Sequence, residues 1–203
     1  MIGVHQLKHQ PLDLTELFDL PRIPFPSRAG VVADRAERSY SVARTATALY
    51  VAYRIAGDFQ LHPLARPGSF IEGLWEYDLV ELFLLDSGGE RYEEFNIAPN
   101  GAWWRCVFSS YRVREDAVDY AEPSPGIATS QRNGSWSVAI GIPFSQLNID
   151  FRAREGERLN VCAIVSNGHG REYLSTAPLD AVKPDFHQTV SYQRCALGVE
   201  VTE

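Results

Sequence analysis

Short runs of apolar or alternating residues, separated by turn-forming residues, recur along most of this sequence of 203 residues. The turn signals are SGGE, PNG, RNG and NGHG, and no helical periodicity lasts longer than about ten residues. This pattern predicts an all-β chain, folded as an antiparallel β-sandwich of the immunoglobulin-like or jelly-roll type with long loops. The strand-like runs are 48–55, 78–85, 92–98, 102–108, 135–142, 158–165 and 189–197.

The first part of the chain differs from the rest. Residues 1–30 include the run PRIPFP (21–26), which favours an extended segment over a helix. We expect this segment to pack on one sandwich domain formed by residues 31–203, because a chain of this length supports a single well-packed core. The stretch FSQLNI (144–149) is expected to make one helical turn.

Charge and hydropathy restrict the partners. With a formal net charge of -7 and a pI of about 5.3, the chain offers no broad basic surface, so nucleic acid is not expected. No apolar run approaches the roughly 20 residues that span a bilayer, so we expect no membrane partner. MIGVHQLKHQPLDL lacks the pattern of a signal peptide, which predicts a bacterial cytoplasmic protein, or a periplasmic or secreted one if the chain is trimmed.

Signals for cofactors are weak. Cys106, Cys162 and Cys195 have no CxxC spacing, which favours reduced, buried thiols over a zinc site. Met1 is the only methionine, which excludes the His/Met type of haem site. No loop of the EF-hand type occurs, although an acidic sandwich can hold a structural calcium ion. We expect no cofactor, and nothing in the sequence indicates the oligomeric state.

One acidic residue, Glu81, interrupts the apolar run DLVELFLL. A buried carboxylate costs several kcal/mol unless it has partners, so we derive its neighbours from hairpin register. A turn at SGGE places Glu81 opposite Asn96, and a two-residue turn at PNG places Asn96 opposite Arg105. The sequence therefore predicts a row of three polar side chains on one face, with Trp104 on the opposite, core-forming face.

The face that carries Glu81 is predicted to mix aromatic area with hydrogen-bonding groups. Glu94 and Trp103 share it, and the long segment 57–77 brings Trp75 toward it. A second long segment, 167–187, is expected to close over the same end or face. Such a mixture suits a sugar, whose ring stacks on an aromatic side chain while its hydroxyls need carboxylate, amide and guanidinium partners.

Several stretches share their order and spacing with a known family: LYVAYRIAGD (49–58), LWEYDLVELFL (74–84), YEEFNIAPNGAWW (92–104), WSVAIGIPFSQL (136–147), LNVCAI (159–164) and PDFH (184–187). Together they resemble the family-nine carbohydrate-binding modules and the broader DOMON-like sandwich superfamily. The resemblance implies one sugar unit held between two aromatic platforms, with acidic, amide and basic side chains on its hydroxyls.

Carried over by position, Trp75 resembles the first platform, Glu81 the acid and Asn96 the amide, with Arg105 in place of a basic ligand. Tyr173 is the candidate for the second platform, where related sequences often carry a Trp. His187, in PDFH, either donates to the ligand or serves as a structural histidine.

Three interpretations stay open. The first, which we expect, is non-catalytic binding of a carbohydrate or a similar polar small molecule. The second is a structural or protein-interaction sandwich whose polar row is satisfied internally. The third is a glycoside hydrolase that uses Glu81 and Glu94, which lie diagonally on one face within about 5 to 8 Å. Catalysis is disfavoured, because no GxSxG motif occurs and Arg105 would keep Glu81 ionised.

Overall fold

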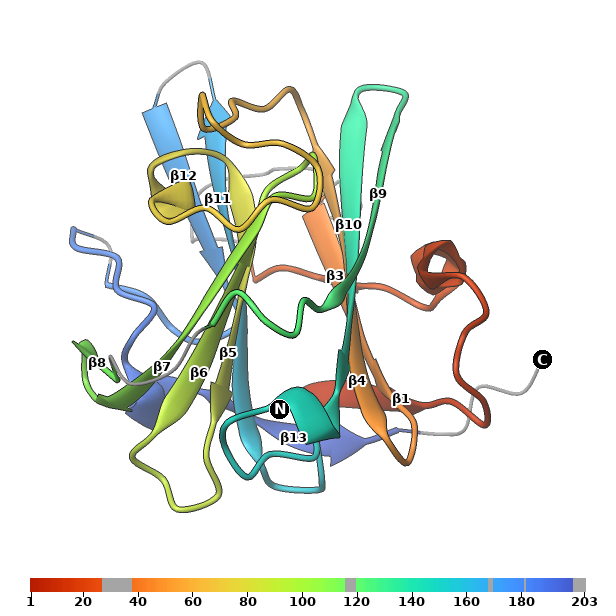
Figure 1. Ribbon diagram of the computed structural model, residues 1–203, viewed down its shortest axis with the longest axis vertical. Coiled ribbons are helices and arrows are strands. Elements are labelled where there is room, and N and C mark those ends of the chain that lie inside the picture. Colours follow the sequence, from red (N-terminus) through yellow and green to blue (C-terminus); the bar gives the residue numbers. More distant parts are fainter. Residues whose placement is uncertain (27–37, 116–119, 168–169, 181, 199–203) are drawn as a thin grey trace.

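Two layers of β-strands face each other in the computed structural model, which describes residues 1–26, 38–115, 120–167, 170–180 and 182–198 (Figure 1). The first sheet contains β1 (Ile2–Gln6), β2 (Ile23–Pro24), β3 (Arg38–Arg44), β4 (Ala48–Ala56), β9 (Gly126–Arg132) and β10 (Ser135–Pro143). The second contains β5 (Leu79–Leu85), β6 (Tyr92–Ile97), β7 (Trp103–Ser110), β8 (Val113–Arg114), β11 (Arg158–Asn167) and β12 (Gly170–Ser175). The predicted all-β sandwich is confirmed.

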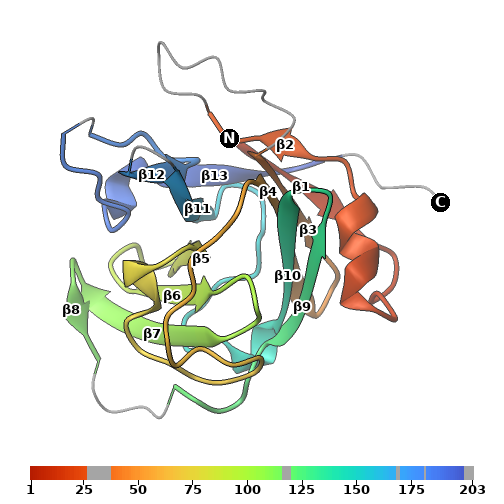
Figure 2. The same ribbon diagram turned by 90° about the horizontal axis from the view of Figure 1, so that it is seen from above.

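Strand β13 (Gln193–Leu197) links the two layers, because it pairs with β11 of the second sheet and with β1 of the first. Most neighbouring strands are antiparallel, as expected, but β1 runs parallel to both β13 and β3. Figure 2 shows the two layers from above, with β13 and β1 along one side. None of the helices in the described part of the chain has the length and apolarity to span a bilayer.

The N-terminal part contains regular structure, strand β1 and the 3-10 helix η1 (Leu14–Asp19), where an extended segment was expected. The sequence carried a signal for η1, a capping box in which Asp13 accepts from the Thr15 N–H and Glu16 accepts from the Asp13 N–H. The predicted turn at 144–149 is present as η3 (Phe144–Gln146). Residues 27–30, 168–169 and 181, which belong to predicted segments, lie outside the described residues.

Register between β5 and β6 is as predicted, with Glu81 opposite Asn96. Between β6 and β7 the prediction is wrong by one residue, because Asn96 lies opposite Trp104 and Phe95 lies opposite Arg105. A shift of one residue reverses the face of every side chain on a strand. Arg105 therefore points between the two sheets, and Trp104 points to the outer side with Glu81.

The PNG turn explains this shift. The Gly101 N–H donates to the Ala98 carbonyl at 2.9 Å and the Ala98 N–H donates to the Ala102 carbonyl at 2.8 Å, which closes a three-residue loop. A two-residue loop would need an N–H from Pro99, which proline lacks. Gly101 adopts a φ of 86°, the left-handed conformation that such a loop requires after its turn.

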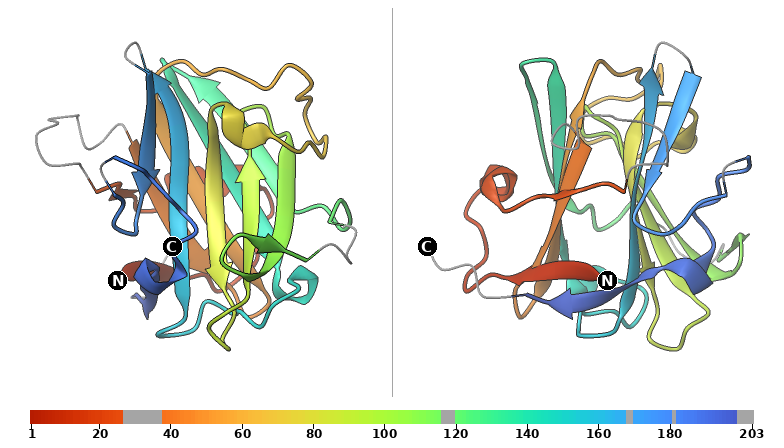
Figure 3. Two further views of the ribbon diagram at one scale, coloured as in Figure 1. Left: turned by 90° about the vertical axis from the view of Figure 1, so that its left-hand side faces the viewer. Right: turned by 180° about the vertical axis from the view of Figure 1, so that it is seen from behind.

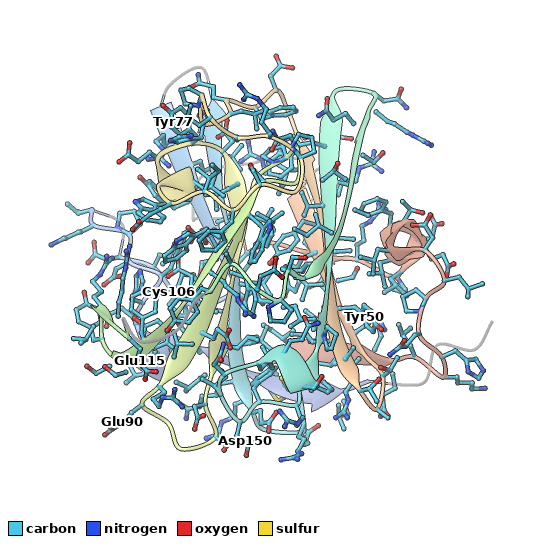
Figure 4. The ribbon with its side chains drawn as sticks, viewed as in Figure 1. Tyr50, Tyr77, Glu90, Cys106, Glu115 and Asp150 are labelled. Atoms are coloured by element: carbon cyan, nitrogen blue, oxygen red, sulfur yellow. The ribbon has the colours of Figure 1, made fainter. Side chains whose placement is uncertain are left out.

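Apolar side chains form a layer on each outer side in addition to the core between the sheets. The outer side of the first sheet is covered by η1, and that of the second by the segments around η2 (Leu74–Glu76) and η4 (Thr189–Ser191). Figure 4 labels Cys106 in the second of these outer layers and Tyr50 in the first. The left view of Figure 3 faces the outer side of the second sheet.

Candidate functional site

A cavity of about 390 Å³ lies on the outer side of the second sheet. Strands β5, β6, β7 and β11 form its floor, and the long segments before β5 and after β12 supply its walls. Its lining consists of Trp75, Glu81, Glu94, Trp104, Phe108, Arg112, Arg114, Ile164, Arg171, Tyr173, Pro184, Phe186 and His187. The site is therefore built on the second sheet alone, away from the core between the layers.

Five residues predicted for the site line this one cavity: Trp75, Glu81, Glu94, Tyr173 and His187. They come from β5, from β6, from β12 and from the two long segments that were expected to lie near each other. Asn96 adjoins the cavity floor, because its Nδ2 donates to Glu94 Oε1 at 2.9 Å.

Arg105 does not belong to the cavity, which corrects the predicted row. Its guanidinium lies on the opposite side of the sheet and is 2% exposed. It donates to the carbonyls of Tyr120 at 2.9 Å, Glu122 at 3.0 Å and Gln146 at 3.2 Å. Its Nη1 lies 3.8 Å from Glu93 Oε1. Arg105 thus fastens neighbouring loops to the inner face of the sheet, opposite the face that carries Glu81.

Trp103 is likewise on the inner side, against the prediction, and its ring meets Phe70 edge to face at a centroid distance of 5.0 Å. Trp104, predicted as core between the sheets, lines the cavity instead. Both errors follow from the one-residue register shift at PNG.

Glu81 and Glu94 are buried diagonal neighbours on β5 and β6, 3% and 4% exposed. Glu94 accepts a hydrogen bond from Asn96, and its Oε2 lies 3.9 Å from His187 Nε2. No residue in the described part of the chain donates a hydrogen bond to the Glu81 carboxylate. The side-chain oxygen of Asn96, directly across from Glu81, is also buried without a partner among the described residues.

This environment disfavours the ionised form of both carboxyls, and that of Glu81 more than that of Glu94. Burial raises the pKa of Glu81 well above its usual value, and the negative charge of Glu94 raises it further. Burial raises the pKa of Glu94 to about 7, although the hydrogen bond from Asn96 opposes the shift. The expectation that Arg105 keeps Glu81 ionised is therefore wrong. A protonated Glu81 carboxyl can donate to the Asn96 oxygen, which leaves Glu94 as the ionised partner.

His187 extends this group of polar side chains. Its Nδ1 lies 2.8 Å from Tyr92 Oη, which itself accepts from the Arg112 N–H at 3.0 Å. Donation from the Tyr92 hydroxyl to Nδ1 places the ring proton on Nε2, on the side of Glu94. Burial lowers the pKa of His187 to about 4, so the ring is neutral at pH 7.

Arginines and aromatic rings form the walls, and none of these arginines was predicted. The Arg114 guanidinium lies 5.4 Å from the Trp75 ring centre and 5.0 Å from that of Trp104, and Arg171 lies 5.7 Å from that of Tyr173. The positions of these arginines depend on the turn after β7 and on β12; β12 follows the turn signal NGHG but was not predicted as a strand. In the described ranges, no group of three or more His, Cys, Asp or Glu is placed to hold a metal ion.

Comparison with known proteins gives a shared fold and distant relatives. No family model matches the chain. A candidate carbohydrate-binding protein from Bacteroides uniformis superposes with a TM-score of 0.70 at 17% identity, covering 94% of this chain and 95% of that one. A family 9 carbohydrate-binding module from Caldicellulosiruptor kristjanssonii, in complex with glucose, gives 0.55 at 12% identity over 87% and 85% of the two chains. These likenesses show a common β-sandwich fold.

Curated relatives are found in vertebrates. The UPF0462 protein C4orf33 homolog of Danio rerio is 26% identical over 137 residues, 64% of this chain and 65% of the relative. UPF0462 protein C4orf33 of Homo sapiens is 27% identical over 131 residues, 62% and 61% of the two chains. The match thus spans less than two thirds of these relatives. The prediction of a bacterial protein, with the localisation assigned on that basis, is wrong, because the curated relatives are vertebrate proteins.

Proposed function

We propose that the cavity on the second sheet binds a carbohydrate or a similar polar small molecule without transforming it. The observation that carries this proposal is the lining itself, in which two buried carboxyls and several aromatic rings border one space. Solved structures with the same fold are described as carbohydrate-binding, with cellotriose or glucose bound in the family 9 module, which supports this class of ligand.

The chemistry of the lining fits a sugar ring. Hydroxyls both donate and accept, so they can donate to ionised Glu94 and accept from protonated Glu81 or from His187 Nε2. Trp75 and Tyr173 offer aromatic area to the apolar face of the ring. The cavity volume is within the range typical of small-molecule sites. The alternative of a polar row satisfied internally loses support, because Glu81 receives no hydrogen bond from a described residue.

Calorimetric titration with a panel of mono- and disaccharides tests the proposal. Wild type should bind one of them, and Trp75→Ala should weaken binding about tenfold through the loss of stacking. Phe18→Ala is the matched control, because Phe18 is a partly buried aromatic residue on η1 that covers the other sheet. No heat from any sugar with folded wild type would contradict the proposal.

A glycoside hydrolase is the second candidate, favoured by the raised pKa of Glu94, because a general acid must hold its proton near neutral pH. Incubation with nitrophenyl glycosides separates the two candidates. Release of nitrophenol by wild type, abolished in Glu81→Gln or Glu94→Gln, would replace the binding proposal. Binding of sugar without turnover would exclude hydrolysis of these substrates.

A further inference from the structure

The cavity lining contains more basic than acidic side chains, although the chain as a whole carries a net charge of -7. Arg112, Arg114 and Arg171 line the cavity, and its lining carboxyls are Glu81 and Glu94. An anionic ligand group depends on a guanidinium whose charge is not already offset by a carboxylate.

Two of these arginines are already paired at the protein surface. Arg112 Nη2 lies 2.8 Å from Asp185 Oδ1, and Arg114 forms an ion pair with Glu72. Asp185 also accepts from the Tyr111 hydroxyl at 2.6 Å, which ties the segment that carries His187 to the turn before β8. These two ion pairs connect β8 and the turn before it to the long segments before β5 and after β12.

Arg171 is different, because no carboxylate in the described residues pairs with it. Its Nη2 donates to the backbone carbonyls of Trp75 and Tyr77, and its guanidinium lies over the Tyr173 ring. These contacts hold the exposed guanidinium against the cavity wall and use a single nitrogen as donor. The remaining N–H groups of the guanidinium form the planar fork that binds carboxylate and phosphate oxygens.

We propose that the ligand is an anionic sugar, with a carboxylate or phosphate group held by Arg171 and its hydroxyls directed to the Glu81 and Glu94 floor. This inference rests on the proposed function and narrows its ligand class. The contrast between the Arg171 guanidinium on the wall and Glu94 on the floor also sets the orientation, because an anion placed on the floor would meet the ionised Glu94 carboxylate. Neutral sugars fit the same cavity but lack the contact with Arg171.

Calorimetry with isosteric probes tests this inference. Glucuronate, galacturonate and mannuronate are compared with their neutral amides, and glucose 6-phosphate with glucose, at low salt and at about 0.3 M salt. At least one anionic probe should bind wild type about tenfold more tightly than its neutral counterpart, and added salt should reduce the difference. The uronate and phosphate arms distinguish the two kinds of anionic group.

Variants at Arg171 test whether this residue binds the anionic group of the ligand. Arg171→Gln should abolish the preference for the anionic probe but keep the weaker affinity for its neutral counterpart. Arg171→Lys should restore part of the preference, because it keeps the charge without the planar fork. Arg194→Gln, which removes an exposed arginine on β13, is the control and should leave the preference unchanged.

Three results would overturn the inference, and they differ in what they imply for the binding site. Equal affinity for anionic and neutral probes would reject the anionic ligand and leave sugar binding intact. Failure of all probes, neutral and anionic, with folded wild type would reject the proposed function as well. A preference that survives Arg171→Gln would reject the assignment to Arg171.

Discussion

The two faces of strands β5, β6 and β7 both bury charged groups, but they compensate the cost in different ways. On the inner face, Glu93 is fully buried and accepts from the Asn148 N–H at 3.0 Å and from Asn148 Nδ2 at 3.2 Å. Arg105 lies 3.8 Å away and donates to three carbonyls. This pair of opposite charges is enclosed by partners from the protein itself.

On the outer face the neighbouring charges have the same sign. The negative charge of Glu94 raises the cost of ionising Glu81, and the Glu81 carboxyl receives no hydrogen bond from the described residues. Buried polar groups normally have partners, so a buried carboxyl that receives no hydrogen bond beside a cavity supports the proposed ligand site. Burial of charge does not by itself mark such a site, because Glu93 and Arg105 are also buried but have partners within the protein.

The largest expected effect on stability comes from removing Arg105 on the inner face. Arg105→Met should lower the free energy of unfolding by about 3 to 5 kcal/mol, because it leaves the Glu93 carboxylate buried without its cation and several carbonyls without a donor. Urea denaturation measures this change. Arg132→Met, at an exposed position on β9, is the control and should stay within about 0.5 kcal/mol of wild type. A loss below about 1 kcal/mol for Arg105→Met would show that the inner pair is not a structural anchor.

The second effect is a gain in stability relative to wild type, and it comes from a substitution on the outer face. The pKa of Glu94 is about 7 in the folded protein against a usual value of 4.5, so the unfolded chain loses this proton first as pH rises. Wild-type stability should therefore fall between about pH 4.5 and 7 by roughly 3 kcal/mol on account of this group. Glu94→Gln cannot ionise, so its stability relative to wild type should increase through this window and level off above it.

Urea denaturation at several pH values between about 4 and 8 measures that difference. Glu90→Gln, at the exposed turn between β5 and β6, is the control for removal of an acidic side chain; Glu90 is labelled in Figure 4. If the stability difference between Glu94→Gln and wild type does not change with pH, the pKa of Glu94 is the same in the folded and unfolded protein. That result would contradict the prediction.

The smallest effect tests whether the two faces are independent. Tyr53, on β4 of the first sheet, donates its hydroxyl to the backbone carbonyl of Glu81 at 2.9 Å from the inner side. Tyr53→Phe should lower the free energy of unfolding by about 1 kcal/mol, measured by urea denaturation, because one buried hydrogen bond is lost. Calorimetry should show unchanged affinity for the sugar that wild type binds. A large change in affinity would show that the inner side positions the Glu81 carboxyl.

The site could be predicted in part from the sequence, and the limits have physical causes. The alternation of β5 and β6 and the SGGE turn placed Glu81 opposite Asn96 correctly, because register within a simple hairpin is local. The predicted register of the next hairpin is wrong because Pro99 lacks an N–H, which changes the loop length. The change moves Trp103, Trp104 and Arg105 to the opposite faces of the sheet. Strand β3 was missed because polar Ser39 and Ser41 are buried in it, which weakens the apolar pattern.

The β-sandwich, most of its central strands and the acid pair follow from the sequence alone, because they depend on periodicities of a few residues. Which charges compensate each other follows only from the packing of distant segments. Arg105 lies beside Glu93 on the inner face, and Arg171 donates to the carbonyl of Trp75, which lies nearly a hundred residues earlier in the chain. Electrostatic partners are set by distance in space, and periodicity along a strand does not encode which distant arginine comes near.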